Sequence, residues 1–282
     1  MEPWLLLGVL AYLSYAISTS IDKRFMNRGY EPVSIQTFKD FFDCVILLII
    51  GLLFFSLNFT FELFLWSLLL GFISAISGIL YFTSLKLKDI EIVVPYLQSS
   101  TILLVFISSI ILFSEIINPF NYIGLVLILI GVYAVLAKKG LGLPRLDRAI
   151  LLISLLVVLT AAYLLLVKSL LFNIEPINLA ISVYFSTTII LACYMLIFRR
   201  KQKGSFDIRN SKIAVSAIFG SMGTLFLFYA LSLGFASRVY PVAGLQSVFV
   251  FIIASIFLRE RFYWHRLAGT IIVFLGILFI SL

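Results

Sequence analysis

Residues 115–131 read EIINPFNYIGLVLILIG, and residues 260–276 read ERFYWHRLAGTIIVFLG. Both stretches hold a glutamate followed by two glycines that are seven residues apart, and the second stretch lies 145 positions after the first. Other landmarks recur at nearly the same offset: Pro95 with Pro241, and Glu31-Pro32 with Glu175-Pro176. Several landmarks that agree on one period indicate an internal repeat. The chain therefore divides into two tandem halves, residues 1–140 and residues 141–282.

The composition indicates a membrane protein. Of the 282 residues, 62% are hydrophobic and 12% are charged, whereas a soluble domain is about half apolar and about a quarter charged. A hydrocarbon core of ~30 Å requires roughly 20 helical residues to span it. Apolar runs of that length occupy most of the chain, which excludes a large soluble domain. Cys44 and Cys193 each lie inside such a run and are interpreted as small buried hydrophobic residues.

Ten apolar runs separated by polar segments predict an all-α integral membrane protein with ten transmembrane helices. The expected helices cover approximately residues 3–21, 38–57, 65–85, 92–113, 120–137, 149–168, 177–198, 213–233, 239–258 and 265–282. Each half of the chain contains five of them. Because five is an odd number, the second half must enter the membrane in the opposite orientation. The predicted fold is therefore two inverted five-helix repeats.

The distribution of basic residues tests this inference, because Lys and Arg accumulate in cytoplasmic loops. Counted in chain order, the odd-numbered loops hold 18 of the 21 basic residues, and the even-numbered loops hold only Lys168 and Arg238. Equivalent loops of the two halves have the opposite bias, as an inverted repeat requires. The count predicts a multi-pass protein of the plasma membrane with the odd-numbered loops in the cytoplasm and both termini outside.

Polar and aromatic side chains interrupt several apolar runs at helical spacing. In the first run, Tyr12, Tyr15 and Thr19 lie along one face of a helix. A phenol or an amide in hydrocarbon requires a hydrogen-bond partner, which is either a neighbouring helix or a ligand. Stripes of small residues are also typical of close helix packing, and this alternative stays open. The candidate substrate-binding residues are Tyr12, Tyr15, Tyr81, Gln98, Thr101, Tyr229, Tyr240, Gln246 and Ser247.

Charged residues within or beside the apolar runs are candidates for coupling or gating. Lys39 and Asp43 lie four residues apart in one expected helix, where they can pair on one face. The alternatives are an interfacial ion pair and a role in ion coupling. Lys168 ends the sixth run, where it either reaches the membrane surface as an anchor or holds a substrate anion. Glu115 and Glu260 are expected to cap the helices that follow them.

The sequence lacks the patterns of common enzyme sites. His265 is the one histidine, which leaves little basis for a histidine-rich zinc site or a Ser-His-Asp triad. Neither a phosphate-binding loop nor a Gly-x-Ser-x-Gly or Cys-x-x-Cys motif occurs. We therefore expect no enzyme activity, no cofactor and no metal site. The net charge of +8 follows from the loops, so no nucleic-acid partner is expected.

A proline, a glutamate about 20 residues later and two glycines seven apart occur once in each half. This pattern resembles the EamA type of the drug/metabolite transporter superfamily, over essentially the whole chain. The segments that carry the resemblance are residues 93–99, 114–115 and 124–131, and residues 240–241, 259–261 and 269–276. Arg24 and Lys168 stand at matching helix ends, as basic residues do in that family, and Lys39 stands where the family often has arginine. A second proline that the family often carries is missing, as is the buried glutamate of the small multidrug relatives.

The resemblance implies a secondary transporter whose site lies between the halves, near mid-membrane, and is reached by alternating access. We expect the cargo to be a small organic solute, an amino acid or a related metabolite, moved by export or exchange. The expected partners are this solute, the lipid bilayer, and protons or another coupling solute, with the chain acting as a monomer or a homodimer. The alternatives are a non-transporting membrane receptor or scaffold and a membrane-embedded enzyme.

Overall fold

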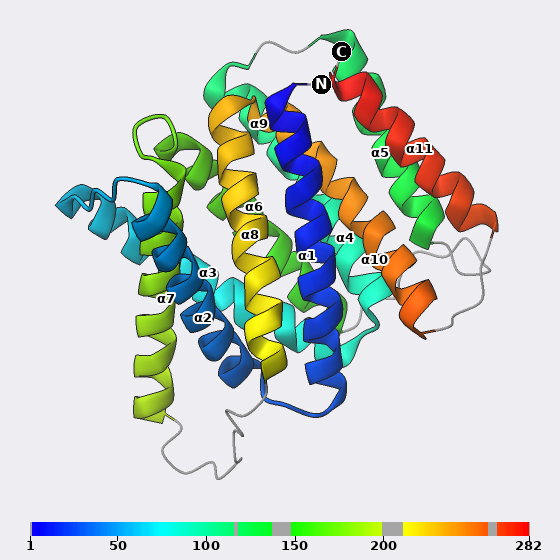
Figure 1. Ribbon diagram of the computed structural model, residues 1–282. Helices are drawn as coiled ribbons and strands as arrows, with labels where there is room; N and C mark the ends of the chain where they lie inside the picture. Colours follow the sequence, from blue (N-terminus) through cyan, green and yellow to red (C-terminus); the bar gives the residue numbers. More distant parts are fainter. Residues whose placement is uncertain (1, 116–117, 137–147, 199–210, 259–263, 282) are drawn as a thin grey trace.

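The computed structural model describes residues 2–115, 118–136, 148–198, 211–258 and 264–281. Within these ranges the regular secondary structure is helical (Figure 1). The elements are α1 (Pro3–Asn27), α2 (Pro32–Phe54), α3 (Phe61–Leu87), α4 (Ile90–Phe113), α5 (Pro119–Leu136), α6 (Arg148–Leu170), α7 (Pro176–Phe198), α8 (Ser211–Leu233), α9 (Ala236–Val239), the 3-10 turn η1 (Tyr240–Ala243), α10 (Gly244–Leu258) and α11 (Trp264–Ser281). Since α9, η1 and α10 follow one another directly, they fill the place of the ninth expected helix.

Most of the helices have the length and composition of membrane spans. Seven segments qualify by both criteria: Pro3–Asn27, Phe61–Leu87, Ile92–Phe113, Arg148–Leu170, Pro176–Ile197, Lys212–Leu233 and Ala236–Ile253. Pro119–Ala134 and Ile271–Ile280 are shorter apolar helices. Helix α2 differs because it carries three charged residues, Lys39, Asp40 and Asp43, in its first half. The chain is thus a multi-pass membrane protein in which α1 carries three charged residues near its C-terminal end, whereas α2 carries its three within the first half of the helix.

Helix α2 begins earlier than its hydrophobicity predicts. The apolar run starts at residue 38, but the helix starts at Pro32, so the predicted boundary is wrong by six residues. Proline at the first helical position has its backbone angle already set for a helix. The added turns contain Gln36 and Thr37, which are polar and nevertheless buried. Hydrophobicity therefore misses the part of α2 that faces a polar interior.

The two halves differ where their equivalent prolines lie. Helix α4 continues through Pro95, whereas Pro241 lies in η1, between α9 and α10. Proline has no backbone N–H and disrupts the hydrogen bond to the residue four positions before it. The first half tolerates this loss within one helix, while the second half changes helix type at the same place.

Equivalent helices of the two halves pack against each other in opposite directions. Gly124 of α5 lies against the carbonyl group of Gly276 of α11, and Gly131 lies against that of Gly269. A Cβ atom added to Gly124 would lie 2.6 Å from the Gly276 carbonyl oxygen, so the two backbones touch. Small residues permit such close approach in membranes. Figure 1 shows this pair of helices side by side at one edge of the molecule.

Two apolar clusters lie toward opposite ends of the bundle. One includes Trp4 at the start of α1 and Leu231 at the end of α8. The other includes Phe25 near the end of α1 and Ile213 near the start of α8. Because α1 and α8 run antiparallel, each cluster joins the start of one helix to the end of the other (Figure 1). Polar residues occupy the space between the clusters.

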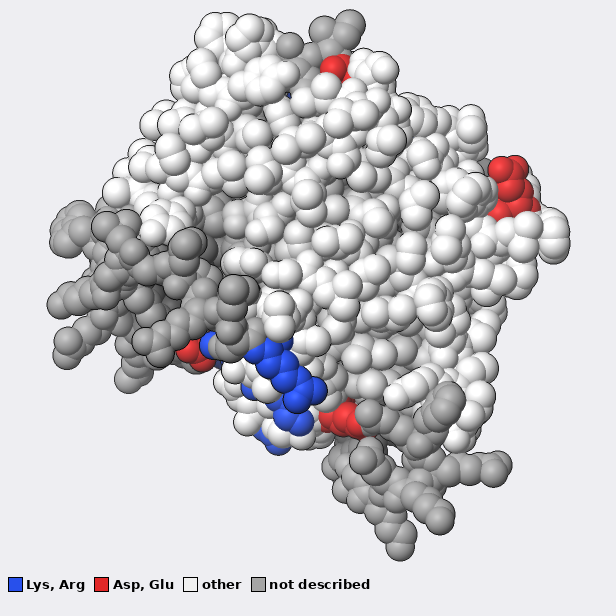
Figure 2. Space-filling model, turned by 180° about the vertical axis from the view of Figure 1, so that it is seen from behind, with Lys and Arg blue, Asp and Glu red and all other residues white. Residues whose placement is uncertain are grey.

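The outer surface is apolar over most of its height. Figure 2 shows one face on which charged side chains are nearly absent except along the edges, with Lys and Arg gathered at the lower edge. Large exposed apolar side chains include Phe54, Ile111 and Leu196. Extended exposed apolar surface marks contact with a membrane or another protein, and here it covers the region that the hydrocarbon core would contact.

Candidate substrate cavity

A cavity of about 280 Å³ lies between the two apolar clusters. Its walls come from both halves of the chain: α1 to α4 of the first half, and α6, α7, α8 and α10 of the second. The polar residues that line it are Tyr12, Tyr15, Ser18, Thr19, Gln36, Lys39, Asp40, Asp43, Ser74, Ser77, Tyr81, Gln98, Thr160, Tyr163, Tyr184, Thr224 and Gln246. Polar groups are costly within a membrane and usually face a cavity or one another, so this lining marks the candidate site.

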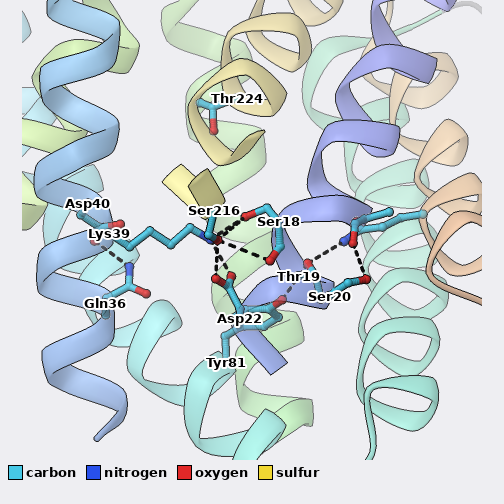
Figure 3. A network of polar contacts seen from close by, with 12 residues as sticks. Ser18, Thr19, Ser20, Asp22, Gln36, Lys39, Asp40, Tyr81, Ser216 and Thr224 are labelled. Atoms are coloured by element: carbon cyan, nitrogen blue, oxygen red, sulfur yellow. Dashed lines mark hydrogen bonds and ion pairs between the residues drawn. The ribbon is translucent and has the colours of Figure 1, made fainter. Parts of the chain in front are cut away.

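An ion pair joins α2 to α1 at one side of the cavity. Lys39 Nζ lies 2.6 Å from Asp22 Oδ2 and donates to Ser18 Oγ at 2.8 Å. Ser216 Oγ of α8 donates to Asp22 Oδ1 at 2.5 Å. Figure 3 shows the Lys39 side chain extending from α2 across to these groups. The network ties three helices together, and Lys39 Nζ also lies 5.8 Å from the centroid of the Phe82 ring.

The predicted pairing of Lys39 with Asp43 is wrong. Among the described residues, Lys39 forms its ion pair with Asp22. A pair within one helix joins only two side chains, whereas the partner on α1 comes with Ser18 and Ser216 as additional hydrogen-bonding groups. A buried ion pair is favourable only when such extra bonds satisfy its remaining atoms. The interhelical arrangement meets this condition.

Asp40 has a neutral partner on its own helix. Gln36 Nε2 donates to Asp40 Oδ2 at 2.6 Å (Figure 3). The Gln36 side chain lies directly against Gly78 of α3, at a place where a Cβ atom would overlap it. Gly78 therefore provides the space that holds Gln36 in position beside Asp40.

Asp43 is buried and only partly satisfied. Its side chain is 1% exposed, and its Oδ1 atom has no hydrogen-bond partner among the described residues. Gly220 of α8 stands opposite, where a Cβ atom would lie 3.2 Å from Oδ1. In the described part of the chain, no three His, Cys, Asp or Glu residues gather closely enough to hold a metal ion. One carboxylate oxygen of this cavity-lining residue thus has no donor among the described residues.

A second network crosses the cavity from α4 to α3. Gln98 Nε2 donates to Gln246 Oε1 at 2.7 Å, which joins the two halves directly. Gln246 Nε2 donates to Thr19 Oγ1 at 3.3 Å, and the Tyr81 hydroxyl donates to the same atom at 2.8 Å. Both glutamines therefore belong to one chain of hydrogen bonds that also involves α1.

Aromatic side chains complete the wall around Thr224 of α8. The hydroxyl groups of Tyr15 and Tyr184 lie 2.9 Å and 2.7 Å from Thr224 Oγ1. The Tyr12 and Tyr15 rings are tilted toward each other with centroids 6.0 Å apart. Each phenol is thereby oriented by a hydrogen bond or a ring contact, as buried tyrosines usually are.

The structure places seven of the twelve predicted site residues on the cavity wall: Tyr12, Tyr15, Lys39, Asp43, Tyr81, Gln98 and Gln246. The other five, Thr101, Lys168, Tyr229, Tyr240 and Ser247, lie elsewhere. Tyr240 donates from its hydroxyl to the Leu164 carbonyl at 3.2 Å, inside an apolar cluster. Tyr229 stacks on Phe55 with centroids 6.1 Å apart. Thr101 and Ser247 are buried away from the cavity lining.

Lys168 is neither an anchor at the membrane surface nor a residue of the cavity. It is 5% exposed and donates to the carbonyl oxygens of Leu231 and Gly234 at 2.7 Å and 2.8 Å. The last carbonyls of a helix lack partners within it, and a cation there is favourable. The matching residue in the first half is Lys23 rather than Arg24, because Lys23 makes the equivalent contacts to α3.

Glu115 also binds a helix terminus, although not the predicted one. Its carboxylate oxygens accept hydrogen bonds from the backbone N–H groups of Ala236 and Ser237 at 2.8 Å and 2.9 Å. These residues begin α9, in the other half of the chain, whereas the expectation was a cap on the next helix. The partner in the repeat, Glu260, lies outside the described residues.

The cavity contains residues that the sequence analysis did not select. The most informative are Gln36 and Asp40, which with Asp43 follow one face of α2 at spacings of four and three residues. Polar residues at helical spacing indicate a shared face. This signal was present in the sequence, but it begins before the apolar run does. Tyr163 and Tyr184 lie in the sixth and seventh apolar runs, in which the sequence analysis identified no polar stripe.

Comparisons with known proteins agree with this architecture. The sequence profile of the EamA-like transporter family matches residues 2–137 and again residues 147–282. An uncharacterized transporter of Archaeoglobus fulgidus is 25% identical over 207 residues, which cover 73% of this chain and 72% of that protein. An uncharacterized protein of Methanocaldococcus jannaschii is 27% identical over 97 residues, 33% of this chain and 69% of that protein. One crystal structure has a similar fold, with a TM-score of 0.76 at 15% identity over 100% of this chain and 99% of its own.

Proposed function

The chain belongs to the EamA-like transporter family, and from this premise we propose that it is a secondary transporter of a small organic solute. The solute is an amino acid or a related metabolite, and it leaves the cell or is exchanged through the cavity between the two halves. The observation that carries the proposal is the polar cavity of about 280 Å³, which both halves line. Binding sites of secondary transporters lie at the interface between repeats. The chain acts as a transporter rather than an enzyme.

We propose that the two halves, residues 1–140 and 141–282, are inverted repeats. The boundary between residues 140 and 141 lies outside the described residues. The antiparallel contacts of α5 with α11 support inversion, because these helices occupy equivalent places in the two halves. Contacts of α2 with α7 give the same support: Thr37 bonds Met195, whereas Gly51, later in α2, packs on Ile181, earlier in α7. Inverted repeats of this kind exchange roles when a cavity opens to one face and then the other.

We propose that both termini lie outside the plasma membrane. The path of the cargo then runs along the membrane normal. Exposed basic residues gather at the end of the bundle that holds the last turn of α1 and the first turn of α8 (Figure 1). These residues are Arg24, Arg28, Lys86, Arg148 and Lys212. Lys and Arg accumulate on the cytoplasmic side, which supports this orientation.

Single-cysteine labelling tests the orientation. Cys193 is exposed and Cys44 is buried, so Cys193→Ser provides the background for a Glu2→Cys variant and a Lys86→Cys variant. We expect a membrane-impermeant thiol reagent to label the Glu2 position from outside the cell and the Lys86 position only in inverted vesicles. The reverse pattern would refute the proposed orientation.

Flux in proteoliposomes tests the transport function. The purified chain is reconstituted and presented with a panel of radiolabelled amino acids and related metabolites. We expect saturable movement of at least one solute, competed by the same unlabelled solute. Folded protein that binds a solute without moving it would support the receptor alternative. Roles for Lys39 and Asp43 in coupling to protons or another solute, and for Lys168 in gating, stay predictions.

A further inference from the structure

The cavity is lined by more carboxyl groups than cationic groups. The titratable residues that line it, besides its tyrosines, are Lys39, Asp40 and Asp43. The charge of Lys39 is already compensated, because Asp22 lies 2.6 Å from its Nζ atom. Lys39 lies near Asp40 and Asp43 as well, but among the described residues neither of these two forms an ion pair. Two carboxyl groups in one membrane-embedded cavity favour the entry of a cation.

Asp43 differs from Asp40 in what its oxygens contact. Asp40 accepts a hydrogen bond from Gln36 at 2.6 Å. Asp43 is 1% exposed, and its Oδ1 atom has no partner among the described residues. A buried acceptor without a donor is unfavourable, and a donor that arrives with the solute would remove this cost. Asp43 Oδ1 can thus accept a hydrogen bond from a ligand.

The surroundings of Asp43 fit an organic cation better than a bare metal ion. Asp43 and Lys39 pack against Gly220, where a Cβ atom would lie 3.2 Å from both Asp43 Oδ1 and Lys39 Cε. Aromatic side chains of the same cavity include Tyr15, Tyr184 and Phe228. Aromatic rings attract ammonium groups through their negative faces, and they supply the apolar contacts that the rest of a small solute requires. The volume is just below the range of roughly 300–1,000 Å³ typical of ligand pockets.

We propose that Asp43 binds the protonated amine of the transported solute and thereby selects solutes that carry an ammonium group. The inference rests on the proposed transport function and adds the chemical class of the cargo. Asp40 lies one helical turn away on the same helix and adds to the negative potential. The pair of Lys39 with Asp22 forms the wall beside them.

Matched ligands test the proposal in the wild-type protein. Thermal stability is measured in detergent with small primary amines and amino acids, and with the N-acetyl derivative of each. Acetylation removes the positive charge and adds a two-carbon acyl group, while the rest of the solute stays the same. Ligands that bind the native state raise the apparent melting temperature. We expect at least one amine to raise it and its acetylated counterpart to leave it unchanged.

A pair of variants tests whether Asp43 is the residue that binds the amine. Asp43→Asn keeps the shape of the side chain and removes the charge, and Glu62→Gln does the same at an exposed position in the first turn of α3. Hydrogen bonds to charged groups are strong enough that we expect Asp43→Asn to weaken the affinity for the amine on the order of 10- to 100-fold. Glu62→Gln should bind the amine as the wild type does.

Specific outcomes would overturn the proposal. An amine and its acetylated form that stabilise the wild-type protein equally would overturn it. This result requires no variant, so it does not depend on whether Asp43→Asn folds. Unchanged amine affinity in a folded Asp43→Asn protein would also overturn the proposal. If that variant altered only the pH dependence of flux, Asp43 would bind a proton and not the amine. Saturable flux of a neutral solute, with no response to amines, would contradict the amine specificity and leave the transport function intact.

Discussion

Lys23 and Lys168 perform the same task in the two halves of the chain. Each donates two hydrogen bonds to carbonyl oxygens at the C-terminal end of a neighbouring helix, at 2.6 Å and 2.8 Å for Lys23 and at 2.7 Å and 2.8 Å for Lys168. The helices are α3 and α8, which are themselves equivalent in the repeat. The internal repeat is therefore preserved down to individual donors and acceptors, at opposite ends of the bundle.

Replacement of Lys168 tests whether this contact stabilises the fold. Lys168→Met keeps a long apolar stem and removes both donors, so two carbonyl groups at the end of α8 lose a partner. An unsatisfied buried group costs roughly 1–3 kcal/mol, and we expect a loss of that size in the free energy of unfolding. Lys86→Met, at an exposed position in α3, should change it by less than about 0.5 kcal/mol. Unfolding by denaturant in detergent measures both, and equal effects would contradict the assigned role.

Two tyrosines form a matched pair for testing the site. Tyr81 lines the cavity and bonds Thr19 at 2.8 Å, whereas Tyr229 lies outside the lining and stacks on Phe55. The substitution to Phe removes one hydroxyl in each case. We expect Tyr81→Phe to reduce saturable flux several-fold, on the order of one neutral hydrogen bond, and Tyr229→Phe to leave it unchanged. Normal flux in both variants would place the path elsewhere.

The bond between Gln98 and Gln246 predicts coupling between the halves. Gln98→Leu removes the donor, Gln246→Leu removes the acceptor, and the double variant removes both. Residues in one hydrogen-bond network show interaction energies of about 0.5–3 kcal/mol in a double-mutant cycle. We expect the double variant to be destabilised by less than the sum of the single ones. Strict additivity in unfolding measurements would show that the bond contributes nothing.

Gly78 offers a prediction about the support of Asp40. Alanine at this position would overlap the amide group of Gln36 and displace the donor that Asp40 uses. Overpacking in a close-packed interior costs typically about 1–3 kcal/mol, and we expect Gly78→Ala to lower both stability and flux. Gly8→Ala is the control, because its Cβ would lie 3.4 Å from Val242, an ordinary contact. Thermal unfolding and flux assays on both variants provide the comparison.

The repeat and the helix count were predictable from sequence because they depend on spacing and hydrophobicity. Glu115, Gly124 and Gly131 recur at one offset. The two glycines, which lie on α5, contact their counterparts Gly276 and Gly269 on α11. Hydrophobicity failed at the start of α2, since Gln36 lines the polar cavity and Thr37 is buried with its hydroxyl bonded to the Val33 carbonyl and to Met195 Sδ. A scale that measures preference for lipid cannot recognise a turn that faces a polar cavity.

The membership of the site was predictable only in part. Gln98 and Gln246 stand 148 residues apart, a slip against the repeat offset of 145 that makes their equivalence uncertain in the sequence alone. In the structure they are in contact, with Gln246 in the first turn of α10, directly after η1. The pairing of Lys39 was not predictable either, since its partner Asp22 lies on another helix. Contacts between helices depend on rotation and depth, which periodicity does not determine.

The interruption of the second half at Pro241, beside the unbroken α4 of the first half, gives the molecule an intrinsic polarity. A 3-10 turn is a poorer hydrogen-bonding arrangement than an α-helix, so the segment around η1 bends more easily than its counterpart around Pro95. We therefore expect the cavity to open more easily toward one side of the membrane than toward the other, even though the two proline-containing segments are equivalent in the repeat. Spin-label distances measured across each side of the cavity would then show two distributions of different width. The solute would meet a more rigid barrier on one side of the membrane and a more flexible one on the other.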